Sequence, residues 1–418
     1  MYITVAVYLL VFALIIWGGR FAGFKDGFVD DFMSVSSTKA VRGLAAVCII
    51  LHHISQETAF KEAGVIQAFL NMGPVLVAVF FFCSGFGLIK NLDSKPDYLN
   101  GFLKNRLVFG IAIPFYVNVI IYGIFHIIYG THFEPLQWVT NLLGLTMMNK
   151  YAWFPIVLMI MYLAFYIIFG KVKNRRLAFF LMFLVIILQG IYFSIWGHFA
   201  WWAGPKNWWL RPNGFLTAKW WMQEFTTWFF GQWWVNATIG FFIGMLYAAH
   251  EESVTAWFKK HYWLKLAGVL ILALLFQALS SFTQYKFGYY TEYSGQGPGI
   301  GDKFITYLSQ LPQIGMIVIF IFLIKMKYRA DNPVLKFFGK YSLDTYLMNL
   351  IPLMVFRPMI QRGKAFPVPI VKPGNYNLAV YAVLAIACTV ILALGERAVT
   401  DMIIKALKQV QAKKAKED

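Results

Sequence analysis

The stretch STKAVRGLAAVCIILHHISQ, residues 37–56, is an apolar segment with Arg42 near its start and His52 and His53 near its end. On an α-helix, the step from Arg42 to His53 turns through about 1100°, so the two side chains lie within roughly 20° of one face. They stand about 16 Å apart along the axis, or half the thickness of the bilayer core. Ionisable groups at such a depth are costly, so both are candidate functional residues.

The composition indicates the class of protein. The chain has 418 residues, of which 59% are hydrophobic and only 13% are charged. Apolar runs long enough to cross a bilayer recur from end to end, which predicts an all-α, polytopic transmembrane helix bundle with about 10–11 spanning helices. The candidate spans are residues 2–18, 41–57, 68–89, 107–129, 152–170, 177–194, 233–249, 264–282, 304–324, 341–357 and 376–396.

The net charge of +18 comes from short basic clusters between the apolar runs. Loop charge of this kind reports topology and attraction to anionic membrane lipid, and it does not predict a nucleic-acid partner. With the N-terminus outside, 26 of the 37 Lys and Arg residues fall on the cytoplasmic side, including those of the expected loop 325–340. We therefore expect a multi-pass protein of the plasma membrane, of the bacterial cytoplasmic type, with a cytoplasmic C-terminus.

A tryptophan-rich connection, residues 195–232, is expected on the outer side. One interpretation is an interfacial aromatic belt. The other is an aromatic platform on which the C–H faces of a sugar acceptor stack. The spacing does not separate them. The tryptophans are Trp196, Trp201, Trp202, Trp208, Trp209, Trp220, Trp221 and Trp228, with Trp233 and Trp234 opening the next span.

Arg42 and His53 each have a structural and a functional interpretation. An Arg at a helix end extends to the headgroups and sets topology, but its planar fork also suits phosphate. An imidazole of near-neutral pKa suits a general base that deprotonates an attacking hydroxyl. Glu57, four residues after His53, either orients the imidazole or marks the outer membrane edge. His52 points about 100° away, and we expect it to pack between helices.

Four stretches in order resemble the acyltransferase-3 family of integral membrane acyltransferases. The first is RGLAAVCIILHH, an Arg and a His separated by ten residues on an early helix. The others are PVLVAVFFFCSGFGLIK (Pro74–Lys90), WWVNATIGFFIGMLYA (Trp233–Ala248) and NPVLKFFGKYSLDTYLMN (Asn332–Asn349). The resemblance divides the chain into an extra N-terminal transmembrane helix with a cytoplasmic linker (1–35), a membrane domain (36–396) and a basic cytoplasmic tail (397–418).

The resemblance implies an O-acyltransferase, most often O-acetyl, that moves an acyl group from cytoplasmic acyl-CoA to a hydroxyl. It assigns transfer to His53 and donor binding to Arg42. The family often carries a paired-basic R-x-x-R motif, but here Arg106 is followed three residues later by Phe109, and Lys104 supplies a nearby charge. Lys104 and Arg106 are therefore either donor-binding residues or topology-setting charges.

The same resemblance marks further residues that line the expected site. Asn349 stands where the family motif commonly ends in His, so we assign it no protonic role. Asp344 is expected to pair with a Lys at the cytoplasmic edge or to line the donor entrance, and Ser84 to pack between helices or to hydrogen-bond within the site. The expected lining residues are Glu57, Ser84, Asn236, Asp344 and Tyr346.

The expected partners are acyl-CoA as co-substrate, membrane lipid, and a cell-surface glycan or its lipid-linked precursor as acceptor. There is no HExxH motif, CxxC pair or glycine-rich phosphate loop, so we expect no metal and no permanently bound cofactor. A rival interpretation is a transporter or exporter of a lipid-linked saccharide or other anionic substrate. It predicts paired halves with interrupted helices, and the sequence shows no such symmetry. The sequence does not predict the acceptor, the acyl chain or the oligomeric state.

Overall fold

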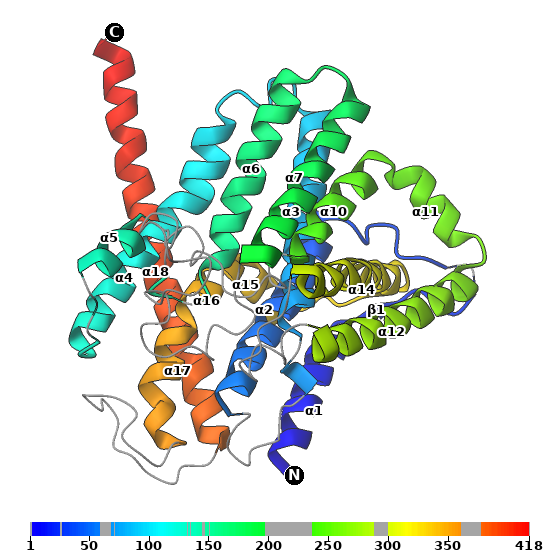
Figure 1. The fold of residues 1–418 in the computed structure, drawn as a ribbon, viewed down its shortest axis with the longest axis horizontal. Coiled ribbons are helices and arrows are strands. Elements are labelled where there is room, and N and C mark those ends of the chain that lie inside the picture. Colours follow the sequence, from blue (N-terminus) through cyan, green and yellow to red (C-terminus); the bar gives the residue numbers. More distant parts are fainter. Residues whose placement is uncertain are drawn as a thin grey trace.

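The structure, a computed structural model, is almost entirely helical (Figure 1). It describes residues 2–25, 27–58, 68–70, 72–131, 133, 135–143, 147–149, 151–196, 236–287, 300–360 and 378–417. The helices are α1 (Tyr2–Ile16), α2 (Val35–Thr58), α3 (Gly73–Ser94), α4 (Ile113–Ile128), α5 (Pro135–Leu142), α6 (Trp153–Lys171), α7 (Arg175–Trp196), α10 (Ile239–Ala249), α11 (Glu251–Lys259), α12 (Tyr262–Phe287), α14 (Ile300–Lys327), α15 (Pro333–Lys340), α16 (Ser342–Met348), α17 (Leu350–Phe356) and α18 (Leu378–Glu417).

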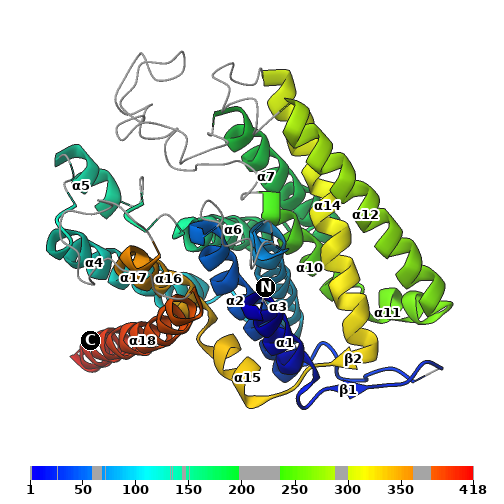
Figure 2. The same ribbon diagram turned by 90° about the horizontal axis from the view of Figure 1, so that it is seen from below.

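Three shorter helical segments and two strands complete the fold. A π-helix, Leu103–Ala112, leads directly into α4, and 3₁₀ turns cover Asn236–Thr238 and Arg357–Met359. Strands β1 (Arg20–Phe21) and β2 (Tyr328–Arg329) form one antiparallel pair. Figure 2 shows this pair at one edge of the bundle, close to α1 and to the end of α14.

Each predicted span falls on a helix, and the polytopic helical architecture is confirmed. Within the described residues, 7 helices are long and apolar enough to cross a membrane, and α1 and α10 are shorter apolar helices. The predicted span 341–357 is divided into α16 and α17 at Asn349. The N-terminus and the C-terminus lie at opposite ends of the molecule (Figure 1). The tryptophan-rich connection falls almost wholly on residues 197–235, which lie outside the described residues.

Helix α2 begins and docks for identifiable reasons. Ser34 caps it, because the backbone N–H of Ser37 donates to the Ser34 hydroxyl oxygen at 3.2 Å. α2 then crosses α15 at close range. A β-carbon on Gly43 would meet the carbonyl of Leu335, and one on Gly339 would meet the carbonyl of Lys39. Glycine at both positions therefore lets the two helix backbones approach.

Asn332 joins the start of α15 to the end of α1. Its side-chain oxygen accepts the Leu335 N–H at 2.8 Å, and Pro333 occupies the first helical position, where no N–H is needed. Its side-chain nitrogen donates to the carbonyl of Leu14 at 2.7 Å and to that of Trp17 at 3.2 Å. The opening of the NPVLKFFGKYS stretch is thus a helix cap that also fixes the end of α1.

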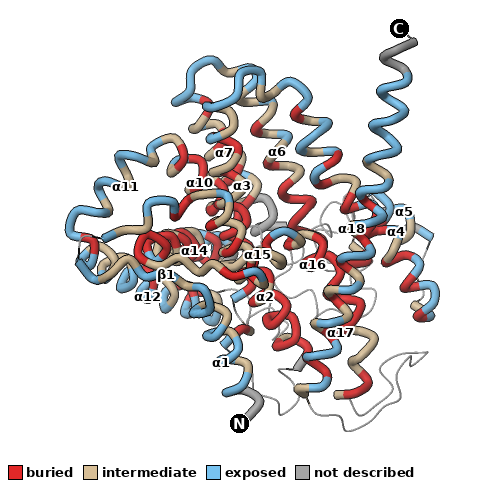
Figure 3. The backbone as a smooth tube through the Cα atoms, turned by 180° about the vertical axis from the view of Figure 1, so that it is seen from behind, coloured by how far each residue is buried: buried red, intermediate tan, exposed pale blue. Residues whose placement is uncertain are grey.

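Helices α3 and α10 pack backbone against backbone. A β-carbon on Gly244 would meet the Phe82 carbonyl, and one on Gly85 would meet the Phe241 carbonyl. Burial is concentrated in this centre of the bundle, whereas α12 and the second half of α18 are largely exposed (Figure 3). Exposed leucine and isoleucine side chains along α12 agree with a surface that faces lipid.

Candidate active site

His53 lies in α2 and its side chain is buried. Its Nδ1 is 3.1 Å from Oδ1 of Asn349, a residue 296 positions away in the sequence. The Asn349 amide nitrogen donates to the Tyr346 carbonyl at 2.9 Å. Because a carbonyl only accepts, the amide nitrogen must face Tyr346 and the amide oxygen must face His53. The neutral imidazole therefore carries its proton on Nδ1, and Nε2 is its basic nitrogen.

Asn349 is held in place by the break between α16 and α17. Pro352 has no N–H with which to continue the helical hydrogen-bond pattern, which favours a break here. Next to the break, the carbonyl of Leu347 accepts three side-chain hydrogen bonds from outside α16. The donors are the Tyr122 hydroxyl at 3.0 Å, Asn118 Nδ2 at 3.2 Å and Asn149 Nδ2 at 2.8 Å. These bonds satisfy a buried carbonyl and fix the backbone that carries Asn349.

Tyr151 covers one face of the His53 ring. The two ring centroids are 3.5 Å apart and the planes differ by 8°, so the rings are stacked. The backbone N–H of Tyr151 donates to Asn149 Oδ1 at 3.0 Å. Asn149 thus links the two residues that contact His53. Its side-chain nitrogen donates to the Leu347 carbonyl, two residues before Asn349, and its side-chain oxygen accepts the N–H of Tyr151. The imidazole is fixed at one ring atom and over one face.

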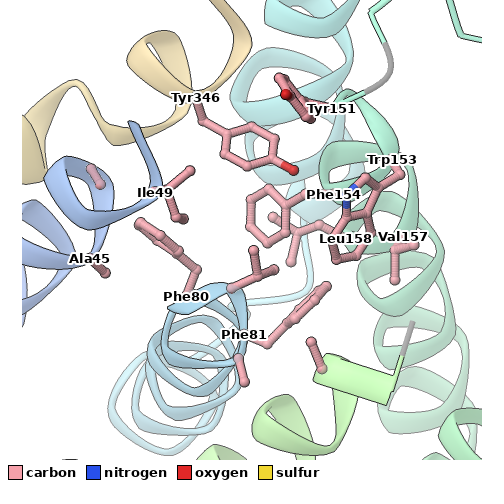
Figure 4. Packing of buried hydrophobic residues seen from close by; sticks show 14 of the residues in the cluster. Ala45, Ile49, Phe80, Phe81, Tyr151, Trp153, Phe154, Val157, Leu158 and Tyr346 are labelled. Atoms are coloured by element: carbon pink, nitrogen blue, oxygen red, sulfur yellow. The ribbon is translucent and has the colours of Figure 1, made fainter. Parts of the chain in front are cut away.

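A small pocket with a volume of about 20 Å³ lies beside His53. His52 lies on its wall, and its Nδ1 is 2.8 Å from the carbonyl of Phe69. Figure 4 shows Tyr346, Tyr151 and Trp153 close to one another near Ile49 of α2. The lining residues are Ile49, His52, His53, Gln56, Gly73, Pro74, Val77, Tyr151, Trp153 and Tyr346. Of the lining residues expected from sequence, Tyr346 is therefore in this pocket.

Glu57, Asn236 and Asp344 lie outside the pocket lining. Glu57 forms an ion pair with Arg357 at 2.7 Å. The residue that bonds His53 Nδ1, and so orients the imidazole, is Asn349. Asn236 is buried and donates to Gln310 of α14, because its turn packs against α3 and α14. Asp344 is buried, and α16 packs against α18. Arg397 and Asp401 of α18 are within electrostatic range of its carboxyl group, and Glu396 of α18 is a neighbouring carboxyl group.

Two of the three predicted donor-binding residues, Arg42 and Arg106, lie within electrostatic range of Tyr162. The guanidinium groups of Arg42 and Arg106 both act electrostatically on its hydroxyl, with which the Ser84 side chain interacts. Arg42 Nε is buried and has no hydrogen-bond partner in the described part of the chain. Arg106 is exposed on the π-helix and lies 5.9 Å from the centre of the Tyr98 ring. The structure thus brings Arg42, Arg106 and Ser84 to one region.

Lys104 takes a different position on the π-helix. Its Nζ lies 5.9 Å from the centre of the Phe109 ring, and the side chain is exposed. Phe109 is the residue that replaces the second Arg of the family's paired-basic motif. Lys104 therefore covers an aromatic ring at the surface, and the structure does not place it among the groups around Tyr162.

Sequence reasoning missed two residues that contact His53. Asn349 was assigned no protonic role because the family motif commonly has His there, but an amide can fix the tautomer of a neighbouring imidazole. Its position after Tyr346 in the NPVLKFFGKYSLDTYLMN stretch was the available signal. Tyr151 lies in no matched stretch, and its stack on His53 depends on the loop that precedes α6.

Residues 35–395 match the family described as Acyltransferase domain. A shorter similarity, with 33% identity over 91 residues, links the chain to an Enterococcus faecalis protein named amino-acid racemase. That alignment covers 22% of this chain and only 13% of the relative, so the racemase activity is a statement about the relative alone. No solved structure matches the chain. Because the family match extends over most of the sequence, the chain belongs to the acyltransferase-3 family of integral membrane acyltransferases.

Proposed function

We propose that this protein is an acyl-CoA-dependent O-acyltransferase that uses His53 as its general base. The observation that carries the proposal is the hydrogen bond from His53 Nδ1–H to Asn349, which leaves Nε2 as the basic nitrogen beside a buried pocket. Arg42 stands eleven residues earlier on α2, about 16 Å away along the axis. That spacing suits a donor whose phosphates bind near Arg42 and Arg106 while its thioester reaches His53.

The reaction follows from these positions. His53 Nε2 takes the proton of the acceptor hydroxyl as its oxygen attacks the thioester carbonyl carbon. The C–S bond then breaks, the acyl group remains on the acceptor oxygen, and the thiolate of CoA leaves. The imidazolium returns the proton to the thiolate, which is released as a free thiol. Asn349 holds the ring so that Nε2 accepts in the first step and donates in the second.

The acyl group and the acceptor are proposed from the family alone. We propose acetyl as the acyl group and a hydroxyl of a cell-surface glycan, or of its lipid-linked precursor, as the acceptor. The protein would lie in the bacterial cytoplasmic membrane with the Arg42 end of α2 at the cytoplasm, in agreement with the distribution of Lys and Arg.

The test is release of CoA thiol from acetyl-CoA by the purified protein in lipid vesicles that contain a glycan extract. We expect His53→Ala to lose the release, because the basic nitrogen proposed to take the hydroxyl proton is removed. His250→Ala is the matched control, since His250 is exposed between α10 and α11 and lies outside the pocket lining. Full transfer by correctly inserted His53→Ala would refute the proposal.

One observation favours the transporter as a second candidate. The break between α16 and α17 places Asn349 in an interrupted helix, and transporters build substrate sites from interrupted helices. The two functions differ in their need for CoA. A protein that takes an anionic saccharide across vesicle membranes and shows no CoA-dependent stabilisation is the transporter.

A further inference from the structure

Lys325 is a buried cation near the end of α14. Its side chain is only 4% exposed, and its Nζ has no hydrogen-bond partner within the described residues. Its Nζ lies 5.0 Å from the centre of the Phe322 ring. An ammonium group buried without a partner is costly, so a resident group of opposite charge would lower the free energy of this arrangement. Sequence reasoning counted Lys325 as a loop cation, which the structure corrects.

Lys327 shows that this part of the fold can satisfy a buried lysine. It lies two residues further along α14 and is 3% exposed. Its Nζ donates to the carbonyls of Lys25 and Gly27, the latter at 2.5 Å. Two neighbouring lysines are therefore equally buried, but the described backbone supplies carbonyl acceptors to only one of them. Lys325 is thus a buried ammonium group without a hydrogen-bond acceptor in the described part of the chain.

Helix α3 connects the surroundings of Lys325 on α14 with those of Arg42 on α2. α14 packs on α3 through Phe322 and Phe82, whose ring centroids are 3.8 Å apart. α3 also packs against α2, the helix that carries Arg42, and Cys83 of α3 lies within electrostatic range of both Lys325 and Arg42. Arg329, Arg42 and Asp31 are further charged groups within electrostatic range of Lys325.

Asp31, the one acidic group among them, is already engaged. It forms an ion pair with Arg329, which also pairs with Asp331 at 2.8 Å. Lys325 and Arg42 are therefore two neighbouring cations that share no acidic residue within the described part of the chain. Arg42 Nε is likewise buried without a hydrogen-bond partner there.

We propose that Lys325 and Arg42 together bind a phosphate group. The inference rests on the proposed function, because it assigns the phosphate to the acyl-CoA donor. Arg offers a planar fork and Lys a point charge, a combination that suits a phosphate held from two sides. The paired-basic motif lacks its second Arg here, because Phe109 stands at that position. Lys325 of α14 would supply the missing positive charge. The phosphate of an anionic phospholipid has the same chemistry and is the other source.

The experiment measures CoA binding by calorimetry, with the full-length protein in nanodiscs of phosphatidylcholine. We expect Lys325→Met to weaken CoA binding about 10- to 100-fold, the loss expected for one charged hydrogen bond. Lys325→Arg should retain most of the affinity. Lys405→Met is the matched control, because Lys405 is an exposed lysine on the distal half of α18.

Two further measurements test whether both cations hold one group. The combined Arg42→Ala and Lys325→Met variant should lose less affinity than the two single losses added, since the residues share a ligand. Binding of pantetheine, which has no phosphate, should not respond to Lys325→Met. Without ligand, Lys325→Met should melt at or above the wild-type temperature, because an unpaired buried charge has been removed.

The outcomes are distinct. Weakened CoA binding supports the site with the donor as its source. If CoA binding is unchanged but Lys325→Met abolishes stabilisation by phosphatidylglycerol, the site holds a lipid phosphate. If Lys325→Met alters neither, the proposal is overturned. A wild-type protein that binds no CoA refutes the proposed function separately, and the phosphatidylglycerol measurement still decides whether Lys325 binds phosphate.

Discussion

Replacing Asn349 by Leu tests whether the orientation of His53 limits catalysis. Leu has a similar volume but offers no acceptor to the Nδ1–H, which now lies 3.1 Å from the Asn349 oxygen. The three hydrogen bonds to the Leu347 carbonyl come from other residues, so the break between α16 and α17 should survive. The substitution therefore removes the partner of His53 with little change to the backbone around it.

The expected loss can be worked from the burial of the ring. His53 is only 5% exposed, so water does not readily replace the lost acceptor. A buried donor left without a partner costs about 1–3 kcal/mol, which corresponds to roughly 5- to 150-fold in rate if the productive tautomer bears the whole cost. We expect kcat to fall about 10- to 100-fold, while KM for the donor changes by less than about twofold because Arg42 is untouched.

The assay is CoA thiol release in lipid vesicles, with melting temperature measured on the same preparations. Asn349→Asp keeps an oxygen acceptor for Nδ1 and should recover much of the lost kcat. Asn91→Leu is the control, because Asn91 bonds the Gly87 carbonyl within α3 and lies outside the pocket lining. Wild-type kcat in a stably folded Asn349→Leu protein would show that the hydrogen bond does not position the base.

Two further predictions concern stability. Gly244→Ala should destabilise the protein by about 1–3 kcal/mol, because its methyl group would meet the Phe82 carbonyl. Gly268→Ala in α12 meets nothing within 4 Å and should be neutral or stabilising by up to about 1 kcal/mol; equal melting temperatures for the two variants would contradict this contrast. The hydrogen bond from Lys336 holds the pKa of Asp331 below its ordinary value. Its stabilising effect of about 1 kcal/mol should thus persist from neutral pH to about pH 4 and fade below, and Asp331→Asn should remove that acid-dependent loss from pH-dependent melting curves.

The helices were predictable because their signal is local. Apolar runs of bilayer length predicted the helical segments, seven of which are long enough to span a membrane within the described residues. The Ser34 and Asn332 caps lie directly before the helices that they begin. The division of 341–357 at Asn349 was not predicted, although Pro352 is visible in the sequence. Hydropathy does not detect such a break, because the run remains apolar. The Leu347 carbonyl beside the break accepts hydrogen bonds from residues of α4 and of the loop before α6.

The candidate site was predictable only along α2. The Arg42–His53 spacing is a property of one helix, so periodicity was sufficient to propose it. The partners of His53 and the proposed partner of Arg42 come from elsewhere: Asn349 follows α16, Tyr151 precedes α6, and Lys325 lies near the end of α14. Lys325 in particular carries no sequence signal, because a lysine at the end of an apolar run looks like a topology-setting charge.

Because Arg42 and His53 share α2 while their partners come from other elements, α2 has a specific part in the proposed function. The helix fixes the separation of base and phosphate-binding Arg, while α16 and α14 supply one partner for each end. Correct function then depends on how α2 sits against its neighbours, and the close crossing with α15 at Gly43 and Gly339 sets that position. A side chain at either glycine would shift α2 relative to Asn349 and Lys325 together. Damage there should reduce both transfer and donor affinity, whereas Asn349→Leu affects transfer alone and Lys325→Met chiefly affinity.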